Sequence, residues 1–103
     1  MDMKLYVVTE CGTICNNMFS LQSGVYSTLE KAQKRMNDIF AKTMKSLDAD
    51  EDFSIVSYEQ DPLETTILFR HIGTNDLHKH FVEIDERTLD EDYVEKIYLE
   101  NNK

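Results

Sequence analysis

The sequence is poor in residues that interrupt structure or link domains. It has one proline and three glycines among 103 residues, and no tract rich in Pro, Gly or Ser that would join two domains. No apolar run approaches the roughly 20 residues that a membrane-spanning helix needs, and no basic segment at the start leads into an apolar stretch. We therefore expect a single domain over residues 1–103, in the cytoplasm, with no signal peptide and no membrane partner.

Cysteines are also few, and the familiar catalytic signatures are missing. Cys11 and Cys15 stand in the segment Cys-Gly-Thr-Ile-Cys, a spacing that fits neither the Cys-x-x-Cys redox motif nor half of a standard zinc site. We expect free thiols in a loop. The sequence has no Gly-rich phosphate loop, no Gly-x-Ser-x-Gly elbow and no His-Glu-x-x-His motif. These absences predict a protein that is not an enzyme and that needs no cofactor.

Basic residues are outnumbered by acidic ones. Twenty Asp and Glu against eleven Lys and Arg give a formal net charge of −9. Most acids fall in residues 48–64 and 83–100, whereas residues 28–47 are mainly basic. Because affinity for nucleic acids comes from Lys and Arg that neutralise phosphates, we expect no direct nucleic-acid binding. A field of this sign favours a protein partner with a basic surface.

The two acidic segments supply the candidate partner-binding residues. These are Asp48, Asp50, Glu51, Asp52, Glu59, Asp61, Glu64, Glu86, Asp90, Glu91, Asp92 and Glu95. An acidic surface can occupy a Lys/Arg groove built for phosphates. The hypothesis is therefore a non-catalytic interaction or regulatory protein. Its most specific form is a phage or mobile-element inhibitor that mimics DNA toward a host defence protein, of the anti-CRISPR or anti-restriction type. The plainer interpretation is that the charge only keeps a small protein in solution.

Residue patterns predict an α+β fold. Strands are expected over 3–10, 18–22, 53–59, 65–72 and 77–84, the first as a central strand buried on both faces. Ser27-Thr28-Leu29-Glu30 matches a capping box, and apolar residues then recur at steps of three and four to about Asp48, which predicts a long amphipathic helix. A second capping box at 88–91 predicts a short C-terminal helix. The order β-β-α-β-β-β-α indicates a mostly antiparallel sheet of about five strands, with the long helix packed on one face.

Three histidines form the one candidate metal cluster. If Gly73–Asp76 closes a four-residue hairpin, Ile72 pairs with Leu77 and His71 faces His78, with His80 on the same face. Two opposed imidazoles could hold zinc or another divalent ion. No acid on that face is fixed as a third ligand, so partly exposed histidines without a metal are the simpler interpretation. The alternatives to the interaction hypothesis are thus a small metal-binding protein using His71, His78 and His80, or a homodimeric structural subunit joined through an uncovered sheet face.

The first half of the chain resembles a known group of proteins. Lys4-Leu5-Tyr6-Val7-Val8, followed by Gly24-Val25-Tyr26-Ser27 and a helix that begins near Glu30-Lys31-Ala32, is similar to a loosely defined group of small uncharacterised bacterial and phage proteins. The resemblance covers about 45 residues and the strand at 53–59. It implies the same fold and a prokaryotic or phage origin, and it implies no activity, because the group has none to carry over.

Overall fold

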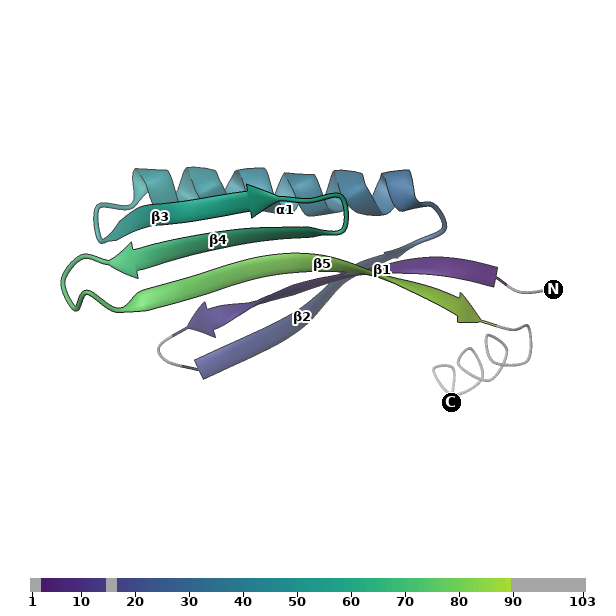
Figure 1. Ribbon diagram of the computed structural model, residues 1–103, viewed down its shortest axis with the longest axis horizontal. Coiled ribbons are helices and arrows are strands. Elements are labelled where there is room, and N and C mark those ends of the chain that lie inside the picture. Colours follow the sequence, from purple (N-terminus) through teal and green to yellow (C-terminus); the bar gives the residue numbers. More distant parts are fainter. Residues whose placement is uncertain (1–2, 15–16, 90–103) are drawn as a thin grey trace.

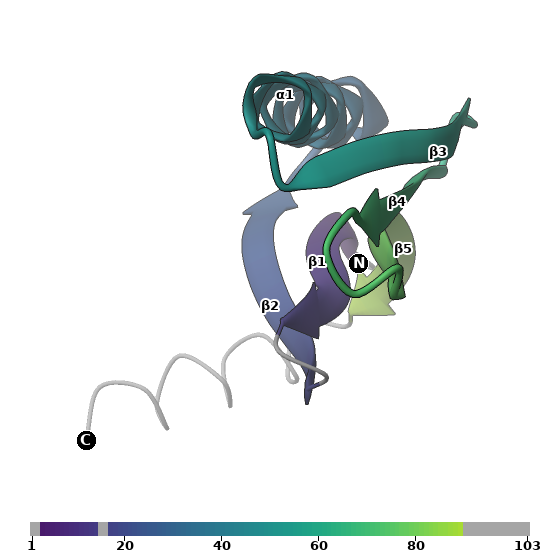
Figure 2. The same ribbon diagram turned by 90° about the vertical axis from the view of Figure 1, so that its left-hand side faces the viewer.

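The computed structural model describes residues 3–14 and 17–89 as five strands and one helix. In chain order these are β1 (Met3–Ile14), β2 (Asn17–Tyr26), α1 (Leu29–Ala49), β3 (Phe53–Gln60), β4 (Glu64–His71) and β5 (Leu77–Leu89). All strands lie in one antiparallel sheet of order β2-β1-β5-β4-β3. The helix lies along one side of this twisted sheet (Figures 1 and 2). The α+β class, the antiparallel sheet and the long helix are confirmed.

The predicted C-terminal helix lies outside the described residues. β5 continues through Thr88 to Leu89, so the first two residues of the second capping box belong to the strand. The acidic residues Asp90, Glu91, Asp92 and Glu95 also lie outside the described part of the chain.

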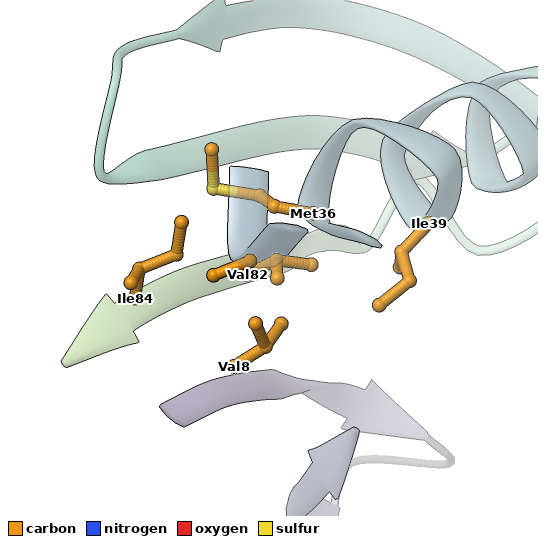
Figure 3. Close-up of a cluster of buried hydrophobic side chains, with 6 residues drawn as sticks. Val8, Met36, Ile39, Val82 and Ile84 are labelled. Carbon is orange, nitrogen blue, oxygen red and sulfur yellow. The ribbon is translucent and has the colours of Figure 1, made fainter. Parts of the chain in front are cut away.

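The helix packs on the sheet through the predicted apolar stripe. Ala32, Met36, Ile39 and Phe40 are its buried residues, and their spacing of three and four puts them on one side. Met36 and Ile39 meet Val8 of β1 and the β5 residues Val82 and Ile84 in the core cluster (Figure 3). Val8, Val82 and Ile84 therefore mark the helix-covered face of the sheet, and the residues next to them in sequence point to the opposite face.

The helix begins one residue later than predicted. Thr28, not Ser27, is the N-cap, and its hydroxyl accepts a hydrogen bond from the backbone N–H of Lys31 at 3.3 Å. Glu30 consequently lies in the first turn, where a carboxylate interacts favourably with the helix dipole. The two adjacent hydroxyl residues offered the same cap chemistry, so only the backbone geometry could choose between them.

The first hairpin is longer than predicted. Cys11, Gly12 and Thr13 were expected in a loop, but they belong to β1 and pair with Ser20, Phe19 and Met18 of β2. A Cβ atom at Gly12 would lie 2.9 Å from the Phe19 ring, so the missing side chain is what admits that ring. Cys11 is accordingly a buried free thiol in a strand, and Cys15 lies outside the described residues. A register shift between Val8 and Thr9 places Ser23 as the extra residue of a bulge beside Gly24.

The histidine-bearing hairpin has a different register from the predicted one. Phe69 pairs with His78, Ile67 with His80 and Thr65 with Val82, a shift of two residues from the predicted pairing. The loop is longer because the backbone N–H of His71 donates to the carbonyl of Asp76 at 2.9 Å, and Asn75 adopts a left-handed conformation with φ of 64°. A shift of two residues keeps every side chain on its predicted face but changes its neighbours.

Candidate functional site

The sheet presents two surfaces with different chemistry, and each contains a hollow. The first, here the helix groove, opens between the sheet and the second half of α1 and has a volume of about 320 Å³. The second, here the acidic groove, lies on β3, β4 and the turn between them and measures about 370 Å³. Polar side chains gather around both hollows.

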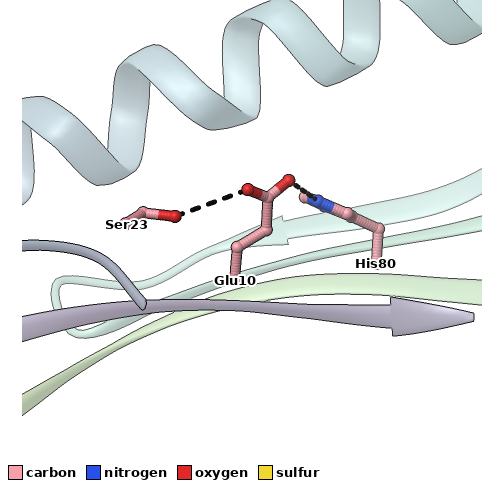
Figure 4. Close-up of polar contacts among 3 residues, drawn as sticks. All are labelled: Glu10, Ser23 and His80. Atoms are coloured by element: carbon pink, nitrogen blue, oxygen red, sulfur yellow. Dashed lines mark hydrogen bonds and ion pairs between the residues drawn. The ribbon is translucent and has the colours of Figure 1, made fainter. Parts of the chain in front are cut away.

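The helix groove contains a close carboxylate–imidazole pair at its base. Glu10 of β1 and His80 of β5 stand up from the sheet toward α1, and Glu10 Oε1 lies 2.7 Å from His80 Nε2 (Figure 4). The hydroxyl of Ser23 donates to the other carboxylate oxygen, Glu10 Oε2, at 3.5 Å. The side chain of His80 is 10% exposed and that of Glu10 is 23% exposed.

The walls of the helix groove are mostly apolar. Phe19, Phe69 and Leu47 supply the apolar surface, and Lys42 and Ser46 reach the rim from α1. A groove with apolar walls and a few convergent polar groups is the usual form of a small-molecule site. Here, however, the carboxylate and the imidazole are already bonded to each other, and no hydroxyl or thiol nucleophile bonds to His80 in the described residues. The geometry therefore describes a satisfied polar pair rather than an assembled catalytic set.

The structure separates the three histidines that the sequence placed together. His71 Nδ1 accepts a hydrogen bond from the backbone N–H of Thr74 at 3.0 Å, within the β4–β5 loop. The His78 ring stacks on Phe69 with 5.4 Å between ring centroids, and its Nδ1 is 3.1 Å from Thr13 Oγ1. His80 is bonded to Glu10. The predicted His71–His78 opposition is thus wrong, because His71 pairs across the sheet with Phe53 and His78 with Phe69.

The separated histidines are not completed into a metal site by other side chains. Within residues 3–14 and 17–89, no group of three or more His, Cys, Asp or Glu side chains could hold a metal ion. His71 and His78 instead pack against an aromatic ring, since the centroid of the Phe53 ring lies 5.3 Å from that of His71 and 6.4 Å from that of His78.

The first acidic segment is divided between the two ends of β3. Asp48, Asp50, Glu51 and Asp52 lie at the end of α1 and in its connection to β3, at the left of Figure 1. Glu59, Asp61 and Glu64 lie at the far end of the strand. An eight-residue strand spans roughly 23 Å, so the two halves form separate surfaces. In the first half, the carboxylate of Asp50 accepts a hydrogen bond from the backbone N–H of Asp52 at 2.9 Å, which gives it a role in the turn.

The second half meets an acid of β5. Glu64 is directly opposite Glu83 in the β4–β5 pairing, and both are exposed. Glu59, Asp61 and Glu64 line the acidic groove. We name Glu59, Asp61, Glu64 and Glu83 the acidic patch. The strand pairings put Glu59, Glu64 and Glu83 on the face that α1 leaves uncovered, and Asp61 lies in the adjoining turn.

The acidic patch differs from its neighbours in having no bound base. Glu86 was predicted to belong to the acidic surface, but it lies on the other face of β5 from Glu83 and pairs with Lys4 Nζ at 3.4 Å. Asp85 pairs with Arg87 at 3.0 Å. The four patch residues form no ion pair with any residue that the structure describes. Glu83 is not among the candidate residues predicted from the sequence. Its place in the patch follows only from its pairing with Glu64.

The bases of the chain lie mainly on the other side of the molecule. Lys31, Lys34, Lys42 and Lys45 are exposed on α1, which covers the opposite face of the sheet (Figure 2). Lys79 is the base nearest to the patch; it borders the acidic groove, and its Nζ lies 4.9 Å from the centroid of the Phe81 ring. The lysines of α1 and the acidic patch therefore lie on opposite sides of the sheet.

Comparison with known proteins adds no relative. No protein-family model matches the chain, and no curated protein or solved structure matches it significantly. The resemblance to small bacterial and phage proteins stays a prediction. Among the described residues, no helix is long and apolar enough to span a membrane.

Proposed function

We propose that this chain is a non-catalytic interaction protein that uses the acidic patch to bind a basic surface of a protein partner. The observation that carries the proposal is the convergence of Glu64 and Glu83 with Glu59 and Asp61 on one exposed surface, where none of the four forms an ion pair within the described residues. Like charges directly opposite each other in a sheet are destabilising. A partner that supplies Lys or Arg would relieve that repulsion on binding.

Apolar side chains beside the patch give the partner something to bury. Leu63, in the turn beside the patch, is more than half exposed, and Leu68 lines the acidic groove on the face that α1 leaves uncovered. Protein interfaces combine aromatic and apolar anchors with polar rims, and charge complementarity adds specificity and a fast association rate. The combination fits a Lys or Arg side chain whose aliphatic part packs on Leu68 while its charged end meets the carboxylates.

The proposed partner surface is one that normally holds nucleic-acid phosphates. Such surfaces are rows of Lys and Arg, and four carboxylates on a rigid sheet can compete for them. In its most specific form, the partner is a host defence protein and the chain is its inhibitor. The sheet supports this use because strands hold the carboxylates of Glu59, Glu64 and Glu83 at set spacings.

The test is competition against nucleic acid with two matched charge variants. Purified chain is titrated into a labelled DNA duplex bound to a basic DNA-binding protein, at several salt concentrations. Glu64→Lys/Glu83→Lys and the control Asp48→Lys/Glu51→Lys both change the formal net charge from −9 to −5, since each of the two replacements adds two charges. The proposal expects the patch variant to lose at least tenfold in competing affinity, and the control to lose far less.

The salt dependence separates the proposal from non-specific charge. Wild-type competition should weaken steeply as salt rises, because screening and counterion effects act on charged contacts. Equal losses in the two variants would mean that net charge alone matters, and that result would reject the patch. The function itself would be rejected if, at low salt, the chain displaced DNA from none of a panel of basic nucleic-acid-binding proteins.

A further inference from the structure

The sheet of the described residues ends at an edge strand that carries no charge. β2 is the first strand in the order β2-β1-β5-β4-β3, and Figure 1 shows its outer side without a neighbouring strand. Its ten residues, Asn-Met-Phe-Ser-Leu-Gln-Ser-Gly-Val-Tyr, include no acid, no base and no proline. Natural sheets block exposed edges with charged side chains, proline or very short strands. β2 has none of these, in a chain whose residues are 30% charged.

The side chains of this edge are also apolar and exposed. Met18 is 79% exposed and Leu21 is 56% exposed. The bulge at Ser23 comes late in the strand, so the preceding run over residues 17–22 keeps a regular row of backbone N–H and C=O groups on its outer side. Such a row is a template for another strand.

The opposite edge is a poor template by comparison. β3 carries Glu59, is followed by Asp61-Pro62, and is interrupted at Val56 by a register shift in its pairing with β4. The Phe40 and Tyr58 rings are 5.9 Å apart, which ties this edge to α1. Pairing through β3 would also bring the acidic patches of two molecules together.

Electrostatics identifies a second copy of the chain as a suitable occupant of the β2 edge. Strands are spaced by about 4.8 Å, so when two copies pair through β2, their Glu83 residues are five strand steps, or roughly 24 Å, apart. That exceeds the Debye length of about 8 Å at physiological salt. Packing through the uncovered sheet faces would instead stack the two faces that carry the acidic patches about 10 Å apart. For a chain of net charge −9, pairing through the β2 edge is therefore the mode of self-association with the least electrostatic repulsion.

We propose that two copies of the chain pair antiparallel through β2, along residues 17–22, to form one continuous ten-stranded sheet about a two-fold axis. An antiparallel pairing of identical strands satisfies two-fold symmetry, the commonest symmetry of protein dimers. Met18 and Leu21 then bury apolar surface across the junction. The pairing leaves both acidic patches exposed at the two outer ends of the sheet, so this inference does not depend on the proposed function.

The test is the mass of the full chain in solution, measured by light scattering and sedimentation over a range of concentrations. The expected mass is twice 12.1 kDa, or about 24 kDa. Met18→Lys/Leu21→Lys should weaken association at least tenfold and shift the mass toward the monomer, with the circular dichroism spectrum unchanged. A single-site control on the other edge, Val56→Lys, replaces a 50% exposed residue and should leave the dimer intact.

Hydrogen exchange locates the contact independently of these variants. Backbone amides of β2 should exchange more slowly as concentration rises, and those of β3 should not change. A monomeric mass at all concentrations would overturn the inference. A dimer that survives Met18→Lys/Leu21→Lys, or that dissociates with Val56→Lys, would overturn it as well. Raising the salt concentration should not dissociate the dimer, whereas it should weaken binding through the acidic patch, so the two proposals fail separately.

Discussion

Glu10 and His80 are joined by a 2.7 Å contact between a carboxylate oxygen and an imidazole nitrogen, although they are 70 residues apart in the chain. The contact links β1 to β5 on the helix-covered face, at the mostly enclosed base of the helix groove. A polar group in such a position costs free energy if its partner is removed.

We expect Glu10→Ala to destabilise the fold by about 1–3 kcal/mol, because it leaves the buried His80 imidazole without its hydrogen-bond partner. His80→Ala should cost a similar amount, and the double variant should cost less than the sum of the two. Chemical denaturation of the four proteins gives the coupling free energy. Strict additivity would mean that the pair contributes nothing beyond its separate packing.

The opposition of Glu64 and Glu83 predicts a gain in stability on neutralisation. Like charges directly opposite each other in a sheet are unfavourable, and cross-strand pairs are worth about 0.2–1 kcal/mol. Glu83→Gln should therefore raise the free energy of unfolding by up to about that amount at low salt, with a smaller gain at high salt. Thermal unfolding at two salt concentrations measures it. Combining the change with Glu64→Gln should add little, since the repulsion has already been removed.

The same substitution ties stability to the proposed function. If the patch is kept for binding, Glu83→Gln should weaken competition with DNA while it stabilises the fold. Functional sites commonly keep residues that are unfavourable for stability. A variant that is more stable and binds as well as the wild type would count against the patch as a binding site.

The N-cap of α1 is a local test of the structure. Thr28→Ala should destabilise the protein by about 1 kcal/mol, because the Lys31 backbone N–H loses its acceptor. Ser27→Ala, one residue earlier, should cost much less. Melting temperatures of the two variants discriminate between the cap that the capping-box motif suggests and the cap that the structure contains. A larger loss at Ser27 would place the helix start one residue earlier.

Met36 is the most informative core position. It is buried between α1 and the sheet, in the cluster with Val8 and Val82, and Met→Ala changes at such positions cost about 2–5 kcal/mol. Met36→Ala should therefore lower the denaturation midpoint strongly, whereas Met3→Ala, at a residue close to half exposed, should have little effect. Equal effects at the two methionines would contradict the packing of the helix on this face.

Local patterns determined much of this architecture. The steps of three and four from Ala32 to Phe40 specify a helix face whatever covers it, and the predicted end near Asp48 agrees with the observed end at Ala49. Alternation of side chains likewise assigned His71, His78 and His80 to one face of the sheet, where the strand pairings also put them. The assignment is correct although the predicted register is wrong by two residues, because the side chains of a strand alternate between the faces with a period of two.

Only the tertiary structure decided which side chains meet. The length of the loop between β4 and β5 depends on the left-handed backbone conformation of Asn75 and on the hydrogen bond that the His71 backbone N–H donates. The Gly-Thr-Asn-Asp segment by itself predicts neither feature. That loop sets the register, and the register separates the three histidines and puts Glu64 opposite Glu83. The pairing of Glu10 with His80 depends on β1 lying beside β5, a neighbour relation between distant segments. Sequence alone determined the faces because these are set by near neighbours along the chain, whereas the candidate site depends on strand order and register, which arise from contacts between segments far apart in it.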